Sequence, residues 1–274
     1  MNGFVSMTDS LKVRSFMTGE SVVPAQGTHI PIKAGTVHVW SARYSTLERY
    51  YSILSAHVTP EEIQRAQGFR KQNDARQYIL RHGMVRSVLG KYLHKDPQKI
   101  QFVQNVNGKP ELSTEGPVAD IRFSMSRTNE RVCLGITRKS AIGLDLVKNL
   151  SGYPFSAVGH HLFTPGERLW IAQEVPGRRS GRFFRIWALK EAVLKATGSS
   201  ARMMQEADLA NIMTDTYLDG WYPVLKGKSE MLFFIHESGC GSGHHRVIAV
   251  TEWSNRTCLN GEPDTGPGNC FTCL

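Results

Sequence analysis

The chain has 274 residues, of which 41% are hydrophobic and 21% are charged, and its formal net charge at pH 7 is +9. This length accommodates one large domain or two small ones, with enough apolar residues to bury a core. The sequence contains no run of about 18 uninterrupted apolar residues, and its start lacks the apolar segment of a secretory signal. We therefore expect a cytoplasmic protein without a membrane-spanning helix.

The positive net charge favours an anionic partner, a class that includes nucleic acid, a membrane surface, a phosphorylated cofactor and an acidic protein. No basic segment is interleaved with aromatic residues and no nucleic-acid module is recognisable, so nucleic acid is disfavoured. The five cysteines are an odd number, and Cys270 and Cys273 have no second pair at metal-ligand spacing. Neither a disulfide framework nor a structural zinc site is therefore predicted.

The predicted elements of the first half begin after a segment without any sustained period, which we expect to be a loose extension. Residues 37–42 alternate like a strand that opens the fold. A helix is predicted over 59–69, where Thr59 and Pro60 form a start signal, and a second helix over 73–92. A strand at 99–105 is followed by a turn at 107–110.

The second half opens with two strands, at 120–126 and 131–137, which a short polar turn joins into a hairpin. A further strand is predicted at 141–147, then a helical region from about 156 and a long helix over 183–198. Two more strands are expected at 231–237 and 245–253. The polar, Gly- and Pro-rich segment after them is predicted to be mobile.

Each half therefore contains a few strands and one long helix. This pattern predicts an α+β fold of two similar halves, each a small, mostly antiparallel sheet packed with a long helix. The expected divisions are an N-terminal extension at 1–36, an N-terminal half at 37–139, a C-terminal half at 140–253, and a flexible tail at 254–274. No residue-level repeat relates the two halves.

The long helix predicted at 183–198 has two contrasting faces. At about 100° per residue, its core stripe consists of Ile186, Leu189, Val193 and Ala196. Glu191 and Lys195 share the other face with Phe184 and Trp187. A solvent-exposed Glu–Lys pair is the ordinary interpretation of that spacing, whereas the aromatic neighbours suggest a face that is covered or lines a pocket.

Asp145 is the only charged residue in the apolar strand predicted at 141–147. Alternation places Gly143, Asp145 and Val147 on one face of this strand. An unpaired buried carboxylate is costly, so Asp145 is expected to be paired, metal-bound or at a pocket edge, unless it lies at a strand end that faces water. Gly143 suggests that another backbone approaches this face closely.

Other candidates for ligand binding are basic residues at turns and on helices. Lys109 lies in the turn at 107–110, which is a phosphate contact or a plain surface turn, and Arg127 follows a strand end where it can hold a phosphate or only face solvent. Arg76 is predicted to share a helical face toward an anion with Arg81 or Arg65, although most arginines of these helices are expected to be solvated.

Five segments in this order, NGKP, FSMSRT, GLDLV, FTPGE and WALKEAVLKATG, resemble motifs of the 4′-phosphopantetheinyl transferase superfamily. The length and the doubled organisation resemble its large, pseudo-dimeric, single-chain type, which acts on carrier proteins. The resemblance extends from about residue 37 to 253. Its most specific parts are the Gly-Leu-Asp at 143–145 and the W-x-x-K-E-x-x-x-K pattern that begins about forty residues later.

The resemblance implies an activity and a set of roles. Enzymes of this superfamily move the phosphopantetheine arm of coenzyme A onto a serine of a carrier protein, release 3′,5′-ADP and hold Mg²⁺ at the pyrophosphate. By analogy, Asp145 and Glu191 are the metal ligands, Glu191 is also the base for the serine, and Lys195 neutralises or protonates the leaving phosphate. Such a reaction independently requires neutralised phosphate charge and a positioned hydroxyl.

The remaining implied calls concern the cofactor site and the partners. The residues implied at the coenzyme A site are Arg65, Arg76, Gly108, Lys109, Pro110, Ser126, Arg127, Asp145, Lys190 and Lys195. We expect a monomer whose partners are coenzyme A and an apo acyl or peptidyl carrier protein, and which binds neither nucleic acid nor a membrane.

Two positions depart from the pattern of the superfamily. Many members carry a second acid two residues after the Asp, where this chain has Val147, and many have His where this chain has Arg127. Mg²⁺ would then have two protein ligands, an arrangement that some members share. The alternative function is therefore a catalytically weakened homologue that binds coenzyme A or a carrier domain without transferring the arm.

Overall fold

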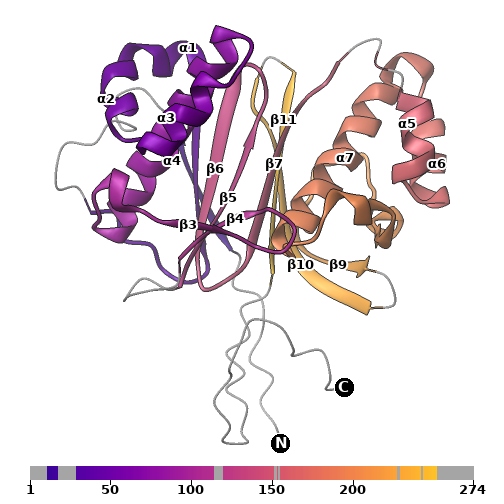
Figure 1. The fold of residues 1–274 in the computed structure, drawn as a ribbon. Coiled ribbons are helices and arrows are strands. Elements are labelled where there is room, and N and C mark those ends of the chain that lie inside the picture. The colour runs from indigo at the N-terminus through magenta and orange to yellow at the C-terminus, as the bar shows by residue number, and fades with distance from the viewer. Residues whose placement is uncertain are drawn as a thin grey trace, which may run out of the picture.

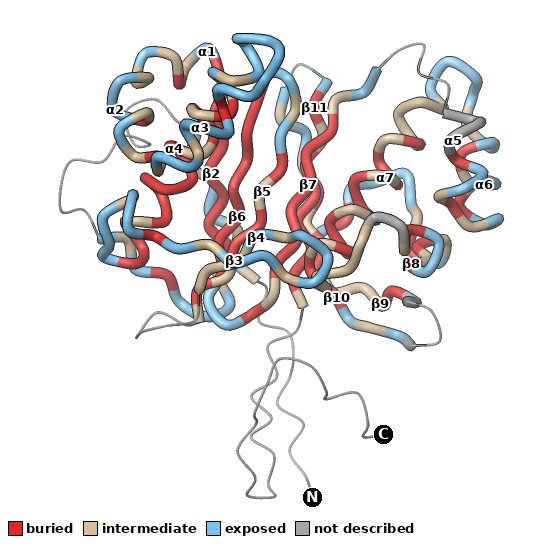
Figure 2. Tube along the Cα trace, in the orientation of Figure 1, coloured by how far each residue is buried: buried red, intermediate tan, exposed pale blue. Residues whose placement is uncertain are grey.

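The computed structural model describes residues 11–17, 29–113, 120–150, 153, 155–226, 229–241 and 243–251. Two sheets lie back to back in the centre, and helices cover their outer faces on both sides (Figure 1). Apolar side chains from both sheets, including Val39, Cys133, Leu144 and Ile248, form a buried layer between them. The tube coloured by burial shows the central strands as the most enclosed part of the molecule (Figure 2). The predicted α+β class is confirmed.

The first sheet has the strand order β1-β2-β6-β5, in which β1 is parallel to β2 and the other pairs are antiparallel. Its strands are β1 (Lys12–Met17), β2 (Thr36–Arg43), β5 (Ile121–Arg127) and β6 (Arg131–Arg138). A separate two-stranded hairpin consists of β3 (Phe102–Gln104) and β4 (Pro110–Leu112). The predicted strand at 37–42, the turn at 107–110 and the hairpin at 120–137 are thus present, with a shorter β3 than expected. The hairpin belongs to the first sheet, which corrects the expectation that its strands open the second half.

Strand β1 corrects the expectation of a loose extension before residue 37. Phe16 stacks on Trp40 of β2 with ring centroids 4.4 Å apart, and Val13 packs against the layer between the sheets. The sequence pattern did not reveal this strand because it is short and carries Lys12 and Arg14 among its apolar residues. The predicted tail at 254–274 lies outside the described residues.

The helices of the first half pack on the outer face of the first sheet (Figure 1). They are α1 (Tyr44–Leu47), α2 (Tyr51–Ala56), α3 (Pro60–Gln67) and α4 (Gln72–Leu93), with 3₁₀ turns at Glu48–Tyr50 and Pro97–Lys99. Leu80, Met84 and Val88 of α4 are fully buried in the core of this half. The two helices predicted over 59–69 and 73–92 are confirmed as α3 and α4.

The second sheet is antiparallel throughout and has the strand order β7-β11-β10-β9-β8. Its strands are β7 (Ile142–Lys148), β8 (Ala207–Asp208), β9 (Asp219–Lys226), β10 (Ser229–Gly239) and β11 (His244–Thr251). The helices of this half are α5 (Phe155–Leu162), α6 (Pro165–Ala172) and α7 (Arg179–Ala196), with 3₁₀ turns at Pro176–Arg178, Ala201–Glu206 and Ala210–Ile212. Strand β9 was not predicted, because Gly220 and Pro223 obscure its strand pattern.

Both halves contain the same local arrangement at the start of a helix, a repeat that was not evident from the sequence. Thr59 and Glu62 form a capping box at α3, and Thr164 and Glu167 form another at α6. In each box the glutamate carboxylate also binds a cation from the long helix of its half. The long helix is thereby fixed to the helix that precedes it.

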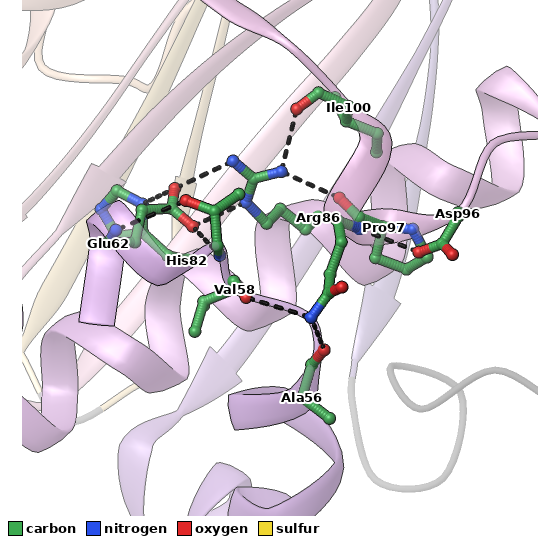
Figure 3. A network of polar contacts seen from close by, with 10 residues as sticks. Ala56, Val58, Glu62, His82, Arg86, Asp96, Pro97 and Ile100 are labelled. Atoms are coloured by element: carbon green, nitrogen blue, oxygen red, sulfur yellow. Dashed lines mark hydrogen bonds and ion pairs between the residues drawn. The ribbon is translucent and has the colours of Figure 1, made fainter. Parts of the chain in front are cut away.

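In the first half this cation is Arg86 of α4. It donates to Glu62 at 2.8 Å and to the carbonyls of Pro97 and Ile100 at 2.9 Å each, so it lies between three chain segments (Figure 3). Burial alone would raise the pKa of Glu62, but hydrogen bonds from His82 and Arg86 lower it to about 2.

In the second half the cation is Lys190 of α7. Its ammonium is 2.7 Å from Glu167, both side chains are fully buried, and it also donates to the carbonyl of Ala207. The backbone N–H of Leu209 donates to the same carboxylate at 2.9 Å. These contacts correct the expectation that Lys190 lies at the coenzyme A site, since its ammonium is enclosed between α6 and β8.

We predict that Glu167→Ala lowers the free energy of unfolding by about 3–5 kcal/mol, because it leaves the buried Lys190 charge unpaired. Thr164→Ala is the matched control, since it removes the capping hydroxyl but keeps the ion pair, and it should cost about 1 kcal/mol. Urea unfolding of both variants measures the difference. Equal losses would show that the ion pair adds nothing beyond the cap.

Candidate active site

Gly143, Asp145 and Val147 lie on the face of β7 that is turned toward α7, as the alternation of the strand predicted. A Cβ atom on Gly143 would lie 1.7 Å from the carbonyl oxygen of Ala192, so only glycine allows α7 to cross the strand at this point. Asp145 contacts α7, and Val147 packs in the core that α7 helps to form. The close backbone approach inferred from Gly143 is thus confirmed, and α7 is the approaching element.

Asp145 is buried, with 5% of its surface exposed, and it is paired. Its Oδ1 accepts hydrogen bonds from the Ser126 hydroxyl at 2.8 Å and from the Lys195 ammonium at 2.6 Å. The same ammonium nitrogen lies 3.7 Å from Oε2 of Glu191. Two carboxylates, one from β7 and one from α7, therefore converge on the Lys195 ammonium. We call Asp145, Glu191 and Lys195 the carboxylate cluster; Ser126 of β5, in the first half, is hydrogen-bonded to it.

The charges of this cluster shift two pKa values. Burial raises the pKa of Glu191, the Lys195 ammonium opposes this rise, and the Asp145 carboxylate adds to it. For Lys195, burial alone would lower the pKa, but Asp145 and Glu191 outweigh it and the pKa is raised. Lys195 is thus held as a cation, and Glu191 is a carboxylate with an increased proton affinity, which suits proton transfer.

The turn between β3 and β4 brings Lys109 close to this cluster through the backbone of the second half. Its ammonium donates to the carbonyl oxygens of Lys195 at 2.7 Å and of Ile142 at 2.9 Å. The pKa of Lys109 is lowered to about 8, mainly by burial; the Glu111 carboxylate opposes this decrease, and the Lys195 charge contributes to it. Gly108 and Pro110 of the same turn are exposed.

The three arginines that were predicted at the coenzyme A site lie on different elements of the first half. Arg127 is exposed at the end of β5, next to Ser126, and Arg65 is exposed on α3. Arg76 is paired with Glu48 at 2.7 Å and its guanidinium lies over the ring of Tyr51. Among the described residues, neither Arg65 nor Arg76 has a hydrogen bond or ion pair with the carboxylate cluster.

Arg76 does not share an exposed face with Arg81. The Arg81 side chain is 8% exposed and lies near the ring of Tyr78, whereas Arg76 is on the surface. The sequence had offered these two as one anion-binding face, and their different burial argues against that pairing.

A cavity of about 390 Å³ is lined by Val147, which lies two residues after Asp145 on β7. Trp170, Phe184 and Tyr217 give it aromatic walls, and His244 and Arg182 add polar groups. The sequence suggested that the aromatic face of the long helix is covered or lines a pocket: Phe184 lines this cavity, whereas Trp187 packs against the core. Trp170 and Tyr217 were not identified from the sequence, because they come from different segments that only the fold brings together.

Within the described parts of the chain, no three His, Cys, Asp or Glu side chains are grouped as a metal site. Mg²⁺ needs less than that, since it is usually held by one or two carboxylates together with substrate phosphates and water. Asp145 and Glu191 converge closely enough to fit this requirement.

Over the ranges that the structure describes, no helix is both long and apolar enough to cross a membrane.

The chain matches two sequence profiles that together cover most of its fold. The profile described as the 4′-phosphopantetheinyl transferase superfamily matches residues 141–247, and the profile described as 4′-phosphopantetheinyl transferase, N-terminal, matches residues 40–138. The first match contains β7 and α7, which carry the carboxylate cluster, and the second contains most of the first half.

Individual relatives agree with the profiles. The 4′-phosphopantetheinyl transferase HetI of Nostoc is 26% identical over 68% of this chain and 79% of its own length. The L-aminoadipate-semialdehyde dehydrogenase-phosphopantetheinyl transferase of Mus musculus is 23% identical over 70% of this chain and 67% of its own length. A phosphopantetheinyl transferase of Thraustochytrium is 28% identical over 58% of this chain, and the match spans 57% of that protein.

The fold and the site define a single-chain, two-part α+β protein with a carboxylate–lysine cluster at the junction of its halves. The chain belongs to the 4′-phosphopantetheinyl transferase superfamily, a family of enzymes, and the resemblance noted from its motifs is confirmed.

We predict that two substitutions move the pKa of Glu191 in opposite directions. Asp145→Asn removes the negative charge that raises this pKa, so the pKa should fall, whereas Lys195→Met removes the cation that lowers it, so the pKa should rise further. Carboxyl NMR titration of Glu191 in the two variants and in the unmodified protein measures both shifts. Shifts of the same sign would contradict the electrostatic description of the cluster.

Proposed function

We propose that this chain transfers the 4′-phosphopantetheine arm of coenzyme A to a serine of an apo acyl or peptidyl carrier protein, giving the holo carrier protein and 3′,5′-ADP. The observation that carries the proposal is the convergence of Asp145 and Glu191 on Lys195, with hydrogen-bond and ion-pair distances of 2.6 and 3.7 Å. The family and the names of the relatives support the same activity.

Asp145 and Glu191 are the residues that would hold Mg²⁺, which neutralises the charge of the pyrophosphate oxygens when bound. Ser126 donates to Asp145 and fixes the direction of its carboxylate. Arg127, exposed one residue further along β5, is available to a phosphate oxygen as a fixed cation.

The transfer forms a bond between the carrier serine oxygen and the β-phosphorus of coenzyme A and breaks the bond from that phosphorus to the oxygen of 3′,5′-ADP. Glu191, directly or through a water, accepts the serine proton, a role that its raised pKa favours. Lys195, held as a cation between two carboxylates, balances or protonates the leaving phosphate.

The second candidate function is a homologue that binds coenzyme A or a carrier domain without transferring the arm. The observation that favours it is Val147, which is buried and apolar where many members of the superfamily carry an acid. The two candidates separate in an assay of labelled arm transfer from coenzyme A to apo carrier domains, run with and without Mg²⁺ on acyl, peptidyl and aryl carriers.

We predict that Glu191→Gln lowers the rate of this transfer by about 10²-fold or more, because it removes both the base and one carboxylate of the metal set. The side chain keeps its size, so the unfolding temperature should change little. The matched control is Glu174→Gln, which changes a glutamate that lines the cavity at Val147 and should retain most activity. Transfer by Glu191→Gln at the unmodified rate would refute the assigned role.

Val147→Glu tests whether a second strand acid is tolerated at this site. Because Val147 faces both the core and the cavity, we predict a stability loss of about 1–3 kcal/mol together with a lower Mg²⁺ concentration for half-maximal transfer. Val147→Gln has nearly the same size without the charge, so it should lose similar stability but leave the Mg²⁺ requirement unchanged. Identical Mg²⁺ titrations of the two variants would exclude Val147 from the metal site.

A further inference from the structure

The turn between β3 and β4 belongs to the first half of the chain, yet it binds the end of α7 in the second half. Asn105 and Asn107 both donate their side-chain amides to the carbonyl oxygen of Gly198, at 3.2 and 2.7 Å. Gly198 lies two residues after Ala196, the last residue of α7, so its carbonyl group is outside the hydrogen-bond ladder of the helix. The turn thus supplies donors to the segment in which α7 ends.

Lys109 completes this contact. Its ammonium donates to the carbonyl oxygen of Lys195, in the last turn of α7, and to that of Ile142, the first residue of β7. A cation at this position also complements the negative end of the helix dipole. One half-buried ammonium therefore connects the end of α7 to the start of β7.

The turn is shaped in advance for this contact. The side-chain oxygen of Asn105 accepts hydrogen bonds from the backbone N–H groups of Asn107 and Lys109, at 2.9 and 3.0 Å. Gly108 has a φ of 82°, and Gly198 has a φ of 64°. A Cβ atom on Gly198 would lie 2.8 Å from the Asn105 amide nitrogen, so the two segments are in direct contact.

The two elements that Lys109 joins are those that carry the reacting groups. The residue whose carbonyl it binds, Lys195, sends its own ammonium to Asp145 at 2.6 Å, and Asp145 lies three residues along β7 from Ile142. A shift of the last turn of α7 would move the Lys195 ammonium relative to the carboxylate. For Lys109 to reach a nucleotide phosphate instead, it would have to leave both carbonyl groups.

We propose that Lys109 is a positioning residue: it holds the last turn of α7 against β7, and so sets the place of Lys195, without itself contacting coenzyme A. The catalytic part of this inference rests on the proposed transferase function. The contact between the two halves of the chain can be tested without it.

The kinetic test is Lys109→Met, which keeps the aliphatic part of the side chain and removes the ammonium. A positioning role predicts that kcat falls by roughly 10- to 100-fold, the effect of misplacing a catalytic group, while KM for coenzyme A stays within about twofold. The reduction should be the same with dephospho-coenzyme A, which lacks the 3′-phosphate. A rise in KM for coenzyme A that disappears with dephospho-coenzyme A would overturn the proposal in favour of a direct phosphate contact.

Asn107→Ala is the matched variant, since it weakens the same contact without changing any charge. Asn107→Ala should also lower kcat, by a smaller factor than Lys109→Met. It serves as the test if Lys109→Met does not fold. An unchanged kcat in both variants would exclude any positioning effect.

Hydrogen exchange provides a readout that does not depend on transfer. The amides of residues 194–199 should exchange faster in both variants, while those of α4 stay as in the unmodified protein. Unchanged exchange at 194–199 would refute the contact itself. If the unmodified protein transfers no arm to any carrier, the proposed function fails, and the exchange result still decides whether Lys109 holds the helix end.

Discussion

The hydrogen-bonded ion pair between Asp145 and Lys195 is the interaction on which the functional part of this molecule depends. It forms because α7 crosses β7 at Gly143, where a side chain of any size would collide with the helix backbone. The crossing brings the buried Asp145 carboxylate within 2.6 Å of the half-buried Lys195 ammonium, and Glu191 lies on the same face of the helix as Lys195. A buried charge needs such a partner, so the packing and the chemistry of the site have one origin.

Two lysines of the second half illustrate how position on a helix separates roles. Lys190 and Lys195 both lie on α7, but Lys190 is fixed by Glu167 and the carbonyl of Ala207, whereas Lys195 faces the cluster at β7. The first is part of an arrangement that recurs in the first half with Glu62 and Arg86 (Figure 3). In each half, a capping glutamate binds a cation of the long helix, and this fixes the helix that carries or supports the site.

Much of the site was accessible to sequence reasoning because alternation and helical period assign residues to faces. They placed Gly143, Asp145 and Val147 together and put Glu191 beside Lys195, and the structure agrees with both assignments. The coenzyme A contacts assigned to Lys190 and Lys109 came from the resemblance and not from periodicity. In the structure the Lys190 ammonium is enclosed by protein oxygen atoms, and the Lys109 ammonium donates to two backbone carbonyl oxygens.

The sequence by itself determined the α+β class, the family and the faces of β7 and α7, since these depend on local period and on the order of short motifs. Only the tertiary structure decided which element covers each face. It added β1 to the first sheet, assembled the cavity beside Val147 from separate segments, and brought the turn of the first half onto the end of α7. Periodicity fixes the direction in which a side chain points, but the partner that meets it there comes from a distant part of the chain.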